Sequence, residues 1–188
     1  MKIGVVSDSH DHKLLLRAAI ADAVARGASS ILHCGDIVAP SSLERLGHHE
    51  VDIHVIHGNN VGDGVGMARL VADPSNRIRY HGQDAELELG GRRIFIVHYP
   101  HYARAMAATG DYDLVCCGHT HHANVEMQAN LAGRETPIVN PGTIAGLGAA
   151  PTYAMVDLST LKWKAPRHGS FTECDLRCYY DNKRIALD

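Results

Sequence analysis

Two histidines that lie close together in the sequence, His119 and His121, have the residue type and spacing of metal ligands. They directly follow the apolar run of residues 114–117, in the segment Gly118-His119-Thr120-His121. In an extended strand residues i and i+2 share a face, but a turn at Gly118 would direct the two imidazoles towards two different ions. The alternative is a pair of ordinary surface histidines in a turn, so the rest of the chain has to decide.

Other metal-competent side chains also come directly after short apolar runs, which are typical of strands buried in a sheet. The carboxyl ends of strands line the ligand crevice of α/β sheets, so residues distant in sequence can meet there. Each residue alone has an ordinary explanation as a cap, a turn former or a strand-end residue. Together, oxygen or imidazole donors at five strand ends indicate a transition-metal site. The predicted ligands are Asp8, His10, Asp36, Asn59, His98, His119 and His121.

The predicted ligands divide between two ions. If Asp36 bridges them, the others form two sets of three: Asp8, His10 and His121, and Asn59, His98 and His119. Two divalent cations against two aspartates leave a charge of about +2, which should attract a phosphoryl group. Two metals roughly 3.5 to 4 Å apart can activate water for in-line displacement at phosphorus. Hydrolysis is therefore expected, with Asp36, Asn59 and His98 catalytic through metal-bound water and phosphate.

The elements that would position these ligands begin with a β-α unit. A strand at residues 3–6 precedes a helix that Asp11 can cap and that stops at Gly27. A strand at residues 31–34, a short helix through Leu43 and Leu46, and a strand at residues 51–56 follow. Residues 61–76 read as a loop, with a helical turn around residues 67–71.

The second half of the chain reads mainly as strands. Residues 85–89 alternate between apolar and polar, Gly90-Gly91 reads as a two-residue turn and residues 92–97 return, which predicts a β-hairpin. A helix at residues 102–108 and a strand at 112–117 follow. The remaining predicted strands are residues 124–128, 137–139 and 153–158, and one or two in the segment with Trp163, Phe171 and Tyr179.

The composition bounds the kind of protein. With 45% hydrophobic and 21% charged residues, the 188-residue chain is expected to form one soluble globular domain, residues 1–188. A net charge of -3 offers no basic stripe for a long nucleic acid, but allows a small phosphorylated substrate. No signal peptide and no apolar run of about 18 residues is recognisable, so a cytoplasmic protein without a membrane partner is expected; a homodimer is left open.

The cysteines do not suggest disulfides or a zinc-thiolate site. They are odd in number and lack CxxC spacing, so they are expected to be reduced core thiols. The adjacent pair at residues 116 and 117 would point to opposite faces of a strand. The five are Cys34, Cys116, Cys117, Cys174 and Cys178.

The motifs resemble those of calcineurin-like metallophosphoesterases, most closely the small bacterial and archaeal phosphodiesterase subgroup. The matching segments are Asp8-Ser9-His10, Gly35-Asp36, Gly58-Asn59, His98, Gly118-His119-Thr120-His121 and Asn140-Pro141-Gly142-Thr143. The resemblance implies a four-layer α/β/β/α sandwich of two mixed sheets with flanking helices. It also implies a dinuclear site for two divalent transition-metal ions, with Mn expected first and Ni, Fe or Zn as alternatives, and it supports the division of ligands given above.

The chain departs from the resemblance at two positions. Asn60 stands where many relatives have a histidine that can act on the leaving group, and a neutral amide cannot serve as a general acid. Tyr99 follows His98 where glycine is common in relatives, and it either shapes the substrate pocket or merely packs. Residues that could support the ligands from behind are His12, His57 and His122, and the Asn140–Thr143 turn.

Two other functions compete with a phosphodiesterase. A phosphomonoesterase of a small metabolite would use the same metals, and specificity would reside in the loops. A scaffold like the retromer subunit of this fold would have lost metal-site residues, whereas all seven positions are intact here. The sequence therefore favours a metal-dependent hydrolase, with a phosphodiesterase preferred.

Overall fold

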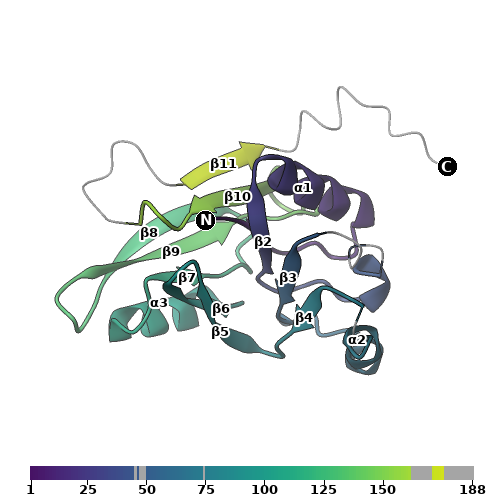
Figure 1. Ribbon diagram of the computed structural model, residues 1–188, viewed down its shortest axis with the longest axis horizontal. Coiled ribbons are helices and arrows are strands. Elements are labelled where there is room, and N and C mark those ends of the chain that lie inside the picture. Colours follow the sequence, from purple (N-terminus) through teal and green to yellow (C-terminus); the bar gives the residue numbers. More distant parts are fainter. Residues whose placement is uncertain (45, 47–49, 74, 162–170, 176–188) are drawn as a thin grey trace.

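Two β-sheets form the framework of the chain. The computed structural model describes residues 1–44, 46, 50–73, 75–161 and 171–175 (Figure 1). A six-stranded sheet has the order β11-β10-β1-β2-β3-β4, and a five-stranded sheet has the order β5-β6-β7-β9-β8. Both sheets mix parallel and antiparallel neighbours, as the resemblance implied.

The first sheet contains the strands that begin the chain. Its parallel strands are β1 (Lys2–Val6), β2 (Ala28–His33), β3 (Asp52–Val55) and β4 (Ile78–Tyr80). On the other side of β1, the antiparallel strands are β10 (Thr152–Asp157) and β11 (Phe171–Asp175). Because β1, β2 and β3 are parallel, their carboxyl ends meet at one edge.

The second sheet starts with the predicted hairpin. Its strands are β5 (Asp84–Leu89), β6 (Arg92–Val97), β7 (Leu114–Cys116), β8 (Ala123–Ala129) and β9 (Glu135–Pro141). β6, β7 and β9 are parallel neighbours, with β5 and β8 antiparallel at the edges. The segments after β6 and β7 therefore leave the sheet at the same end.

The helices lie outside the two sheets. Helices α1 (Lys13–Ala25) and α2 (Gly64–Val71) pack on the first sheet, and α3 (Pro100–Thr109) packs on the second (Figure 1). A 3-10 turn, η1 (Pro40–Ser42), follows β2. With the two sheets between these helices, the order of layers is α/β/β/α, which confirms the expected fold class.

Among the described residues, three apolar cores hold the four layers together. Leu16 and Ile20 of α1 are fully buried against the first sheet, and burial of each stabilises the fold by roughly 1.5 to 3 kcal/mol. Ile3 and Ile94 belong to the core between the sheets, and the third core joins α3 to the second sheet. Side chains alternate between faces along each strand, so one strand contributes to two cores.

The adjacent cysteines show this alternation. Cys116 belongs to the core between the sheets, and Cys117 to the core beneath α3. Cys34, Cys116 and Cys117 are free and buried, and burial raises the pKa of each thiol. They are therefore reduced core thiols, as predicted. The side chain of Cys174 and the whole of Cys178 lie outside the described residues.

Some expected elements differ in extent. α2 is a full helix that starts at Gly64 within the expected loop, because the Asp63 carboxylate accepts a hydrogen bond from the Gly66 N–H (2.8 Å). The expected helix through Leu43 and Leu46 is only the turn η1, followed by further turns where the structure describes it. β4 was not expected, since three residues are too few to show a periodicity.

The start of α1 also differs from expectation. His12 occupies the cap position and its Nδ1 accepts from the Leu15 N–H (3.4 Å). Asp11 instead accepts hydrogen bonds from the Ala39 N–H (2.8 Å) and the Ser42 hydroxyl (2.6 Å). Of the predicted final strands, β11 includes Phe171, whereas Trp163 and Tyr179 lie outside the described residues. The assignment of residues 1–188 to one domain stays a prediction.

Candidate metal centre

The seven predicted ligands come together at one end of the two sheets. They leave the sheets in the segments that follow β1, β2, β3, β6 and β7. The parallel arrangement of strands within each sheet places these segments at one edge, so predicted ligands as far apart in sequence as His10 and His121, 111 residues, are in contact. The seven residues are Asp8, His10, Asp36, Asn59, His98, His119 and His121.

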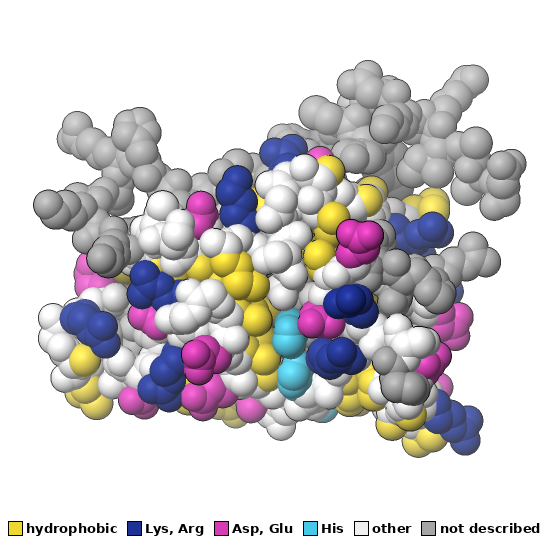
Figure 2. Space-filling view, in the orientation of Figure 1, with side chains coloured by type: hydrophobic (Ala, Val, Ile, Leu, Met, Phe, Trp, Pro, Cys, Tyr) yellow, Lys and Arg dark blue, Asp and Glu magenta, His cyan; other side chains and the backbone are white. Residues whose placement is uncertain are grey.

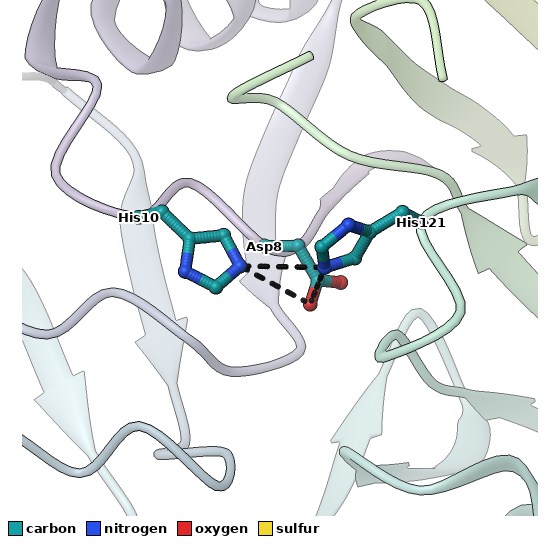
Figure 3. A group of neighbouring side chains, drawn as sticks. All are labelled: Asp8, His10 and His121. Atoms are coloured by element: carbon teal, nitrogen blue, oxygen red, sulfur yellow. Dashed lines mark hydrogen bonds and ion pairs between the residues drawn. The ribbon is translucent and has the colours of Figure 1, made fainter. Parts of the chain in front are cut away.

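The first cluster consists of Asp8, His10 and His121, which point towards one another from two loops, the one after β1 and the one after β7 (Figure 3). The two Nε2 atoms of the histidines are 3.3 Å apart. His121 Nε2 lies 3.3 Å from Asp8 Oδ1, and His10 Nε2 lies 3.9 Å from the same oxygen. Three atoms with metal-ligand chemistry thus surround one point.

The second cluster is formed by Asn59, His98 and His119. Asn59 Oδ1 lies 3.0 Å from His98 Nε2 and 2.9 Å from His119 Nδ1. The ring centroids of the two histidines are 5.1 Å apart. The two histidines of the Gly118–His121 turn therefore point to different clusters.

Two aspartates connect the clusters. Asp36 Oδ2 lies 3.7 Å from His10 Nε2, and Asp36 Oδ1 lies 3.6 Å from His98 Nε2. Asp8 also has an oxygen close to ligand atoms of Asp36 and His98. Both carboxylates are almost fully buried, with 0% and 2% exposure.

Hydrogen bonds turn electron lone pairs towards the centre of the site. His98 Nδ1 is 2.8 Å from the Cys34 carbonyl oxygen, and His121 Nδ1 is 2.8 Å from that of Leu147. A carbonyl oxygen only accepts, so each Nδ1 carries the proton, and in the neutral ring Nε2 presents its lone pair to the cluster. Asp8 Oδ1 is buried there and has no hydrogen-bond partner among the described residues. Hydrogen-bond acceptors that face one another repel. A cation bound between these lone pairs and carboxylate oxygens would attract all of them, so the residues fit a metal.

The backbone of the ligand loops is strained. Five of the predicted ligands have positive φ angles: Asp8 (52°), His10 (39°), Asp36 (58°), His119 (72°) and His121 (62°). Such conformations cost about 1 to 3 kcal/mol each and persist only where the surroundings enforce them. Hydrogen bonds from the Asp8 N–H to the Gly35 carbonyl (3.0 Å) and from the His10 N–H to the Asp36 carbonyl (2.9 Å) join two of these loops.

Glycines allow the ligand loops to approach the ligand side chains. A Cβ on Gly58 would lie 2.8 Å from His98 Nε2 and would clash with Asp36 Oδ1. A Cβ on Gly118 would lie 2.7 Å from Asp8 Oδ2. Both contacts are shorter than real Cβ atoms tolerate, so the clusters require glycine at these two positions.

Comparisons with known proteins agree with this geometry. A family model of the calcineurin-like phosphoesterase superfamily domain matches residues 1–161. The chain belongs to this superfamily. Phosphodiesterase MJ0936 of Methanocaldococcus jannaschii is 28% identical over 167 residues, which cover 87% of this chain and 97% of the relative. The resemblance of the motifs and the expectation of a metal-dependent phosphoester hydrolase are confirmed.

Solved structures show the same fold. An archaeal phosphodiesterase superposes with a TM-score of 0.78 at 27% identity, over 94% of this chain and 100% of the other. A phosphoesterase from E. coli has a TM-score of 0.59 at 18% identity, over 84% and 89% of the two chains. Vps29 from Entamoeba histolytica has a TM-score of 0.57 at 16% identity, over 84% and 86%. The last two similarities concern the fold alone.

In this phosphoesterase Asn60 is engaged with Asp36. Its side-chain amide donates to Asp36 Oδ2 (2.6 Å), and its backbone N–H donates to Asp36 Oδ1 (2.9 Å). The sequence placed Asn60 only at the leaving-group position. The structure adds that this residue orients the carboxylate between the clusters.

His33 is a supporting residue that the sequence interpretation missed. Its Nδ1 accepts from the Gly35 N–H (3.3 Å), so its Nε2–H donates to the Ser9 hydroxyl (3.0 Å). The fully buried imidazole thus joins the loops that carry Asp8 and Asp36. The pKa of His33 is lowered to about 3, mainly by burial and secondly by the nearby His98, so the ring is neutral. The available signal was a histidine at the end of an otherwise apolar buried strand.

The residues expected behind the ligands behave differently from one another. The Thr143 hydroxyl donates to the Asp8 carbonyl (3.0 Å), and the Asn140 amide donates to the Gly118 carbonyl (2.7 Å), so the Asn140–Thr143 turn supports two ligand loops. His57 contacts the Tyr80 hydroxyl, His122 contacts the Thr120 carbonyl, and His12 caps α1. The rings of His98 and His121 are held by backbone carbonyls and not by these three histidines.

Proposed function

We propose that this chain is a phosphodiesterase that binds two divalent transition-metal ions at the site just described. The observation that carries the proposal is the convergence of lone pairs in two clusters, one of which contains Asp8 Oδ1, a buried oxygen that accepts no hydrogen bond from the described residues. Imidazole, carboxylate and amide ligands suit Mn, Fe, Ni or Zn, and we propose Mn first. The ligand set is Asp8, His10, Asp36, Asn59, His98, His119 and His121.

We assign the bridging role to Asp36. Its two oxygens face histidines of different clusters, and each oxygen accepts a hydrogen bond from Asn60. Asp8 Oδ2 is already engaged by the His119 N–H (2.9 Å), which leaves Oδ1 for the first cluster. Asp8, His10 and His121 then hold one ion, and Asn59, His98 and His119 hold the other.

The protein's own contribution is to orient these ligands before substrate arrives. Carbonyls of Cys34 and Leu147 fix two imidazoles, and Asn60 fixes the bridging carboxylate. Ions bound there would lower the pKa of a water molecule and neutralise the charge of a phosphoryl group. The chain thus supplies a positioned anion-binding centre for ester hydrolysis, in which Asp36, Asn59 and His98 have the central roles.

Several observations support a small diester as the substrate. A relative and a structural neighbour that both align with most of this chain are phosphodiesterases. Acidic and basic side chains are interspersed on the face in Figure 2, and the net charge is -3, so a long nucleic acid is not the partner proposed.

No helix among the described residues is long and apolar enough to cross a membrane. A cytoplasmic location, the absence of a membrane partner and a homodimer remain predictions.

Two measurements test the proposal. Elemental analysis after Mn loading should find two ions per chain, and less than one would contradict the dinuclear centre. Bis(p-nitrophenyl) phosphate and p-nitrophenyl phosphate, compared with Mn present, should show faster turnover of the diester. Faster monoester turnover would favour the phosphomonoesterase, and absence of metal with absence of turnover would favour a scaffold.

A further inference from the structure

A cavity of about 310 Å³ opens beside the second cluster. Asn59 and His98 line it, so a phosphoryl group bound at the proposed centre would have this space next to it. The volume is within the range of small-molecule binding sites, which begins at about 300 Å³. One substituent of the phosphorus can therefore enter the cavity.

The remaining walls are partly apolar. Val61, Val97 and Tyr99 supply apolar and aromatic surface, while Gln83 and His57 supply polar groups. The described residues that line the cavity include no lysine, arginine, aspartate or glutamate. His57 is held by a hydrogen bond to the Tyr80 hydroxyl (2.6 Å). Such walls fit a neutral group with an apolar body and a polar edge better than a second anionic group.

Tyr99 joins the cavity to the metal ligands. Its ring centroid lies 5.3 Å from that of His98 and 4.9 Å from that of His119, with interplanar angles of 71° and 65°. The rings of His101 and Tyr102 are inclined to it by 40° and 85°. None of these neighbours lies parallel to the Tyr99 ring, so no described aromatic ring is stacked flat on it. Tyr99 lines the cavity, so an incoming planar group can contact its ring there.

We infer that this cavity binds a planar aromatic group esterified to the phosphate, and that Tyr99 selects for it by ring contact. The inference rests on the proposed function, because the phosphoryl group must be held at the adjacent centre. It assigns Tyr99 to the pocket, of the two roles that the sequence left open. Gln83 can hydrogen-bond polar atoms on the edge of the aromatic group.

Binding of phosphonates tests this inference without turnover, because the P–C bond of a phosphonate is not an ester. Calorimetry would compare phenylphosphonate with methylphosphonate on the Mn-loaded protein. The two ligands share the anionic head, so the ratio of their dissociation constants reports the contribution of the ring. We expect the wild type to bind phenylphosphonate about tenfold more tightly, the size of a favourable aromatic contact with its burial.

Substitutions at two neighbouring tyrosines separate ring contact from bulk. Tyr99→Leu should reduce the preference to less than about threefold, whereas Tyr99→Phe should keep it, because the ring is retained. The matched control is Tyr102→Leu, which removes an exposed tyrosine (48%) that does not line the cavity. This control should keep the wild-type preference, and circular dichroism would show that all three variants are folded.

The outcomes separate the inference from the proposed function. Equal binding of the two phosphonates by the wild type, or an unchanged preference in Tyr99→Leu, would overturn the inference and leave the metal centre intact. If neither phosphonate bound the Mn-loaded protein, the anion-binding centre itself would be wrong, and the inference would fall with it.

Discussion

At the scale of single residues, the centre depends on a few side chains that hold others in place. Asn60 contacts both oxygens of Asp36, His33 joins two ligand loops, and backbone carbonyls orient His98 and His121. Supporting contacts of this kind typically change metal affinity or activity by about 10- to 100-fold. Metal affinity should therefore depend on these supporting residues as well as on the proposed ligands.

Asp36→Asn tests the bridge. The substitution removes one negative charge between the two clusters and keeps the size of the side chain. We expect activity to fall below a tenth of wild type and Mn content to fall, with little change in thermal unfolding. The control is Asp111→Asn, an exposed aspartate after α3. A variant with more than a tenth of the activity would show that the bridge is assigned wrongly.

Asn60→His tests leaving-group protonation. Because Asn60 cannot donate a proton as an acid, wild-type rates should depend steeply on leaving-group acidity across a series of aryl and alkyl diesters. A histidine at this position should flatten that dependence and accelerate poor leaving groups, since general acid catalysis contributes about 10²- to 10⁴-fold.

The control for this series is Asn60→Ala. It removes the hydrogen bond from the Asn60 side-chain amide to Asp36 Oδ2 without adding an acid. The control therefore separates the loss of Asp36 orientation from the gain of proton transfer. A shallow slope already present in the wild type would show that another acid operates, with His12, His57 and His122 the first residues to substitute.

At the scale of elements, the loops after the strands must come close to one another. Gly58→Ala places a Cβ against Asp36 and His98 after β3, so we expect loss of Mn binding from a protein that still folds. Gly64→Ala, at the start of α2, is the matched control, because its Cβ would meet no atom of the described residues within 4 Å. Titration with Mn would compare them, and equal Mn affinity in both variants would contradict the close-packed centre.

At the scale of the whole molecule, a buried neutral histidine makes stability depend on pH. The pKa of His33 is about 3 in the folded protein and near 6.5 when unfolded, so the unfolded chain binds more protons between these values. The contribution of His33 to the free energy of unfolding is complete above about pH 6.5. It is lost as the pH falls towards 3, by up to about 1.4 kcal/mol per pH unit. Burial also lowers the pKa of His54, to about 4, which acts in the same direction.

Urea unfolding of the metal-free protein between pH 7.5 and pH 5 measures this dependence. His33→Leu should be less stable at pH 7.5, because the Gly35 N–H loses its acceptor, but its stability should fall less steeply with acid. Parallel pH profiles for wild type and His33→Leu would contradict the buried neutral state of this residue.

Metal retention should also be lost in acid. Histidine ligands must be neutral to bind, and an ordinary imidazole protonates near pH 6.5. Activity and bound Mn should therefore fall together as the pH drops through about 6, as measured by turnover and elemental analysis on the same samples. A flat profile down to pH 5 with metal still bound would rule out a centre rich in histidine.

The sequence by itself determined the types of the proposed ligand residues and the strand ends that carry them. These features are local: Asp8, Asp36 and His98 each follow a short apolar run, and the direction of a strand decides where its following turn lies. The hairpin around Gly90-Gly91 and the alternating faces of Cys116 and Cys117 were predictable for the same reason, since a strand has a period of two.

Only the tertiary structure decided which of these residues touch. The contacts of Asn60 with Asp36, of His33 with Ser9, and of Tyr99 with His119 join segments 20 or more residues apart, through loops whose conformations have no periodic signal. Five of the proposed ligands adopt positive φ angles that their residue types do not favour, because cross-loop hydrogen bonds and packing outweigh local preference. The cavity beside Tyr99 exists for the same reason, since its walls come from three separate segments of the chain.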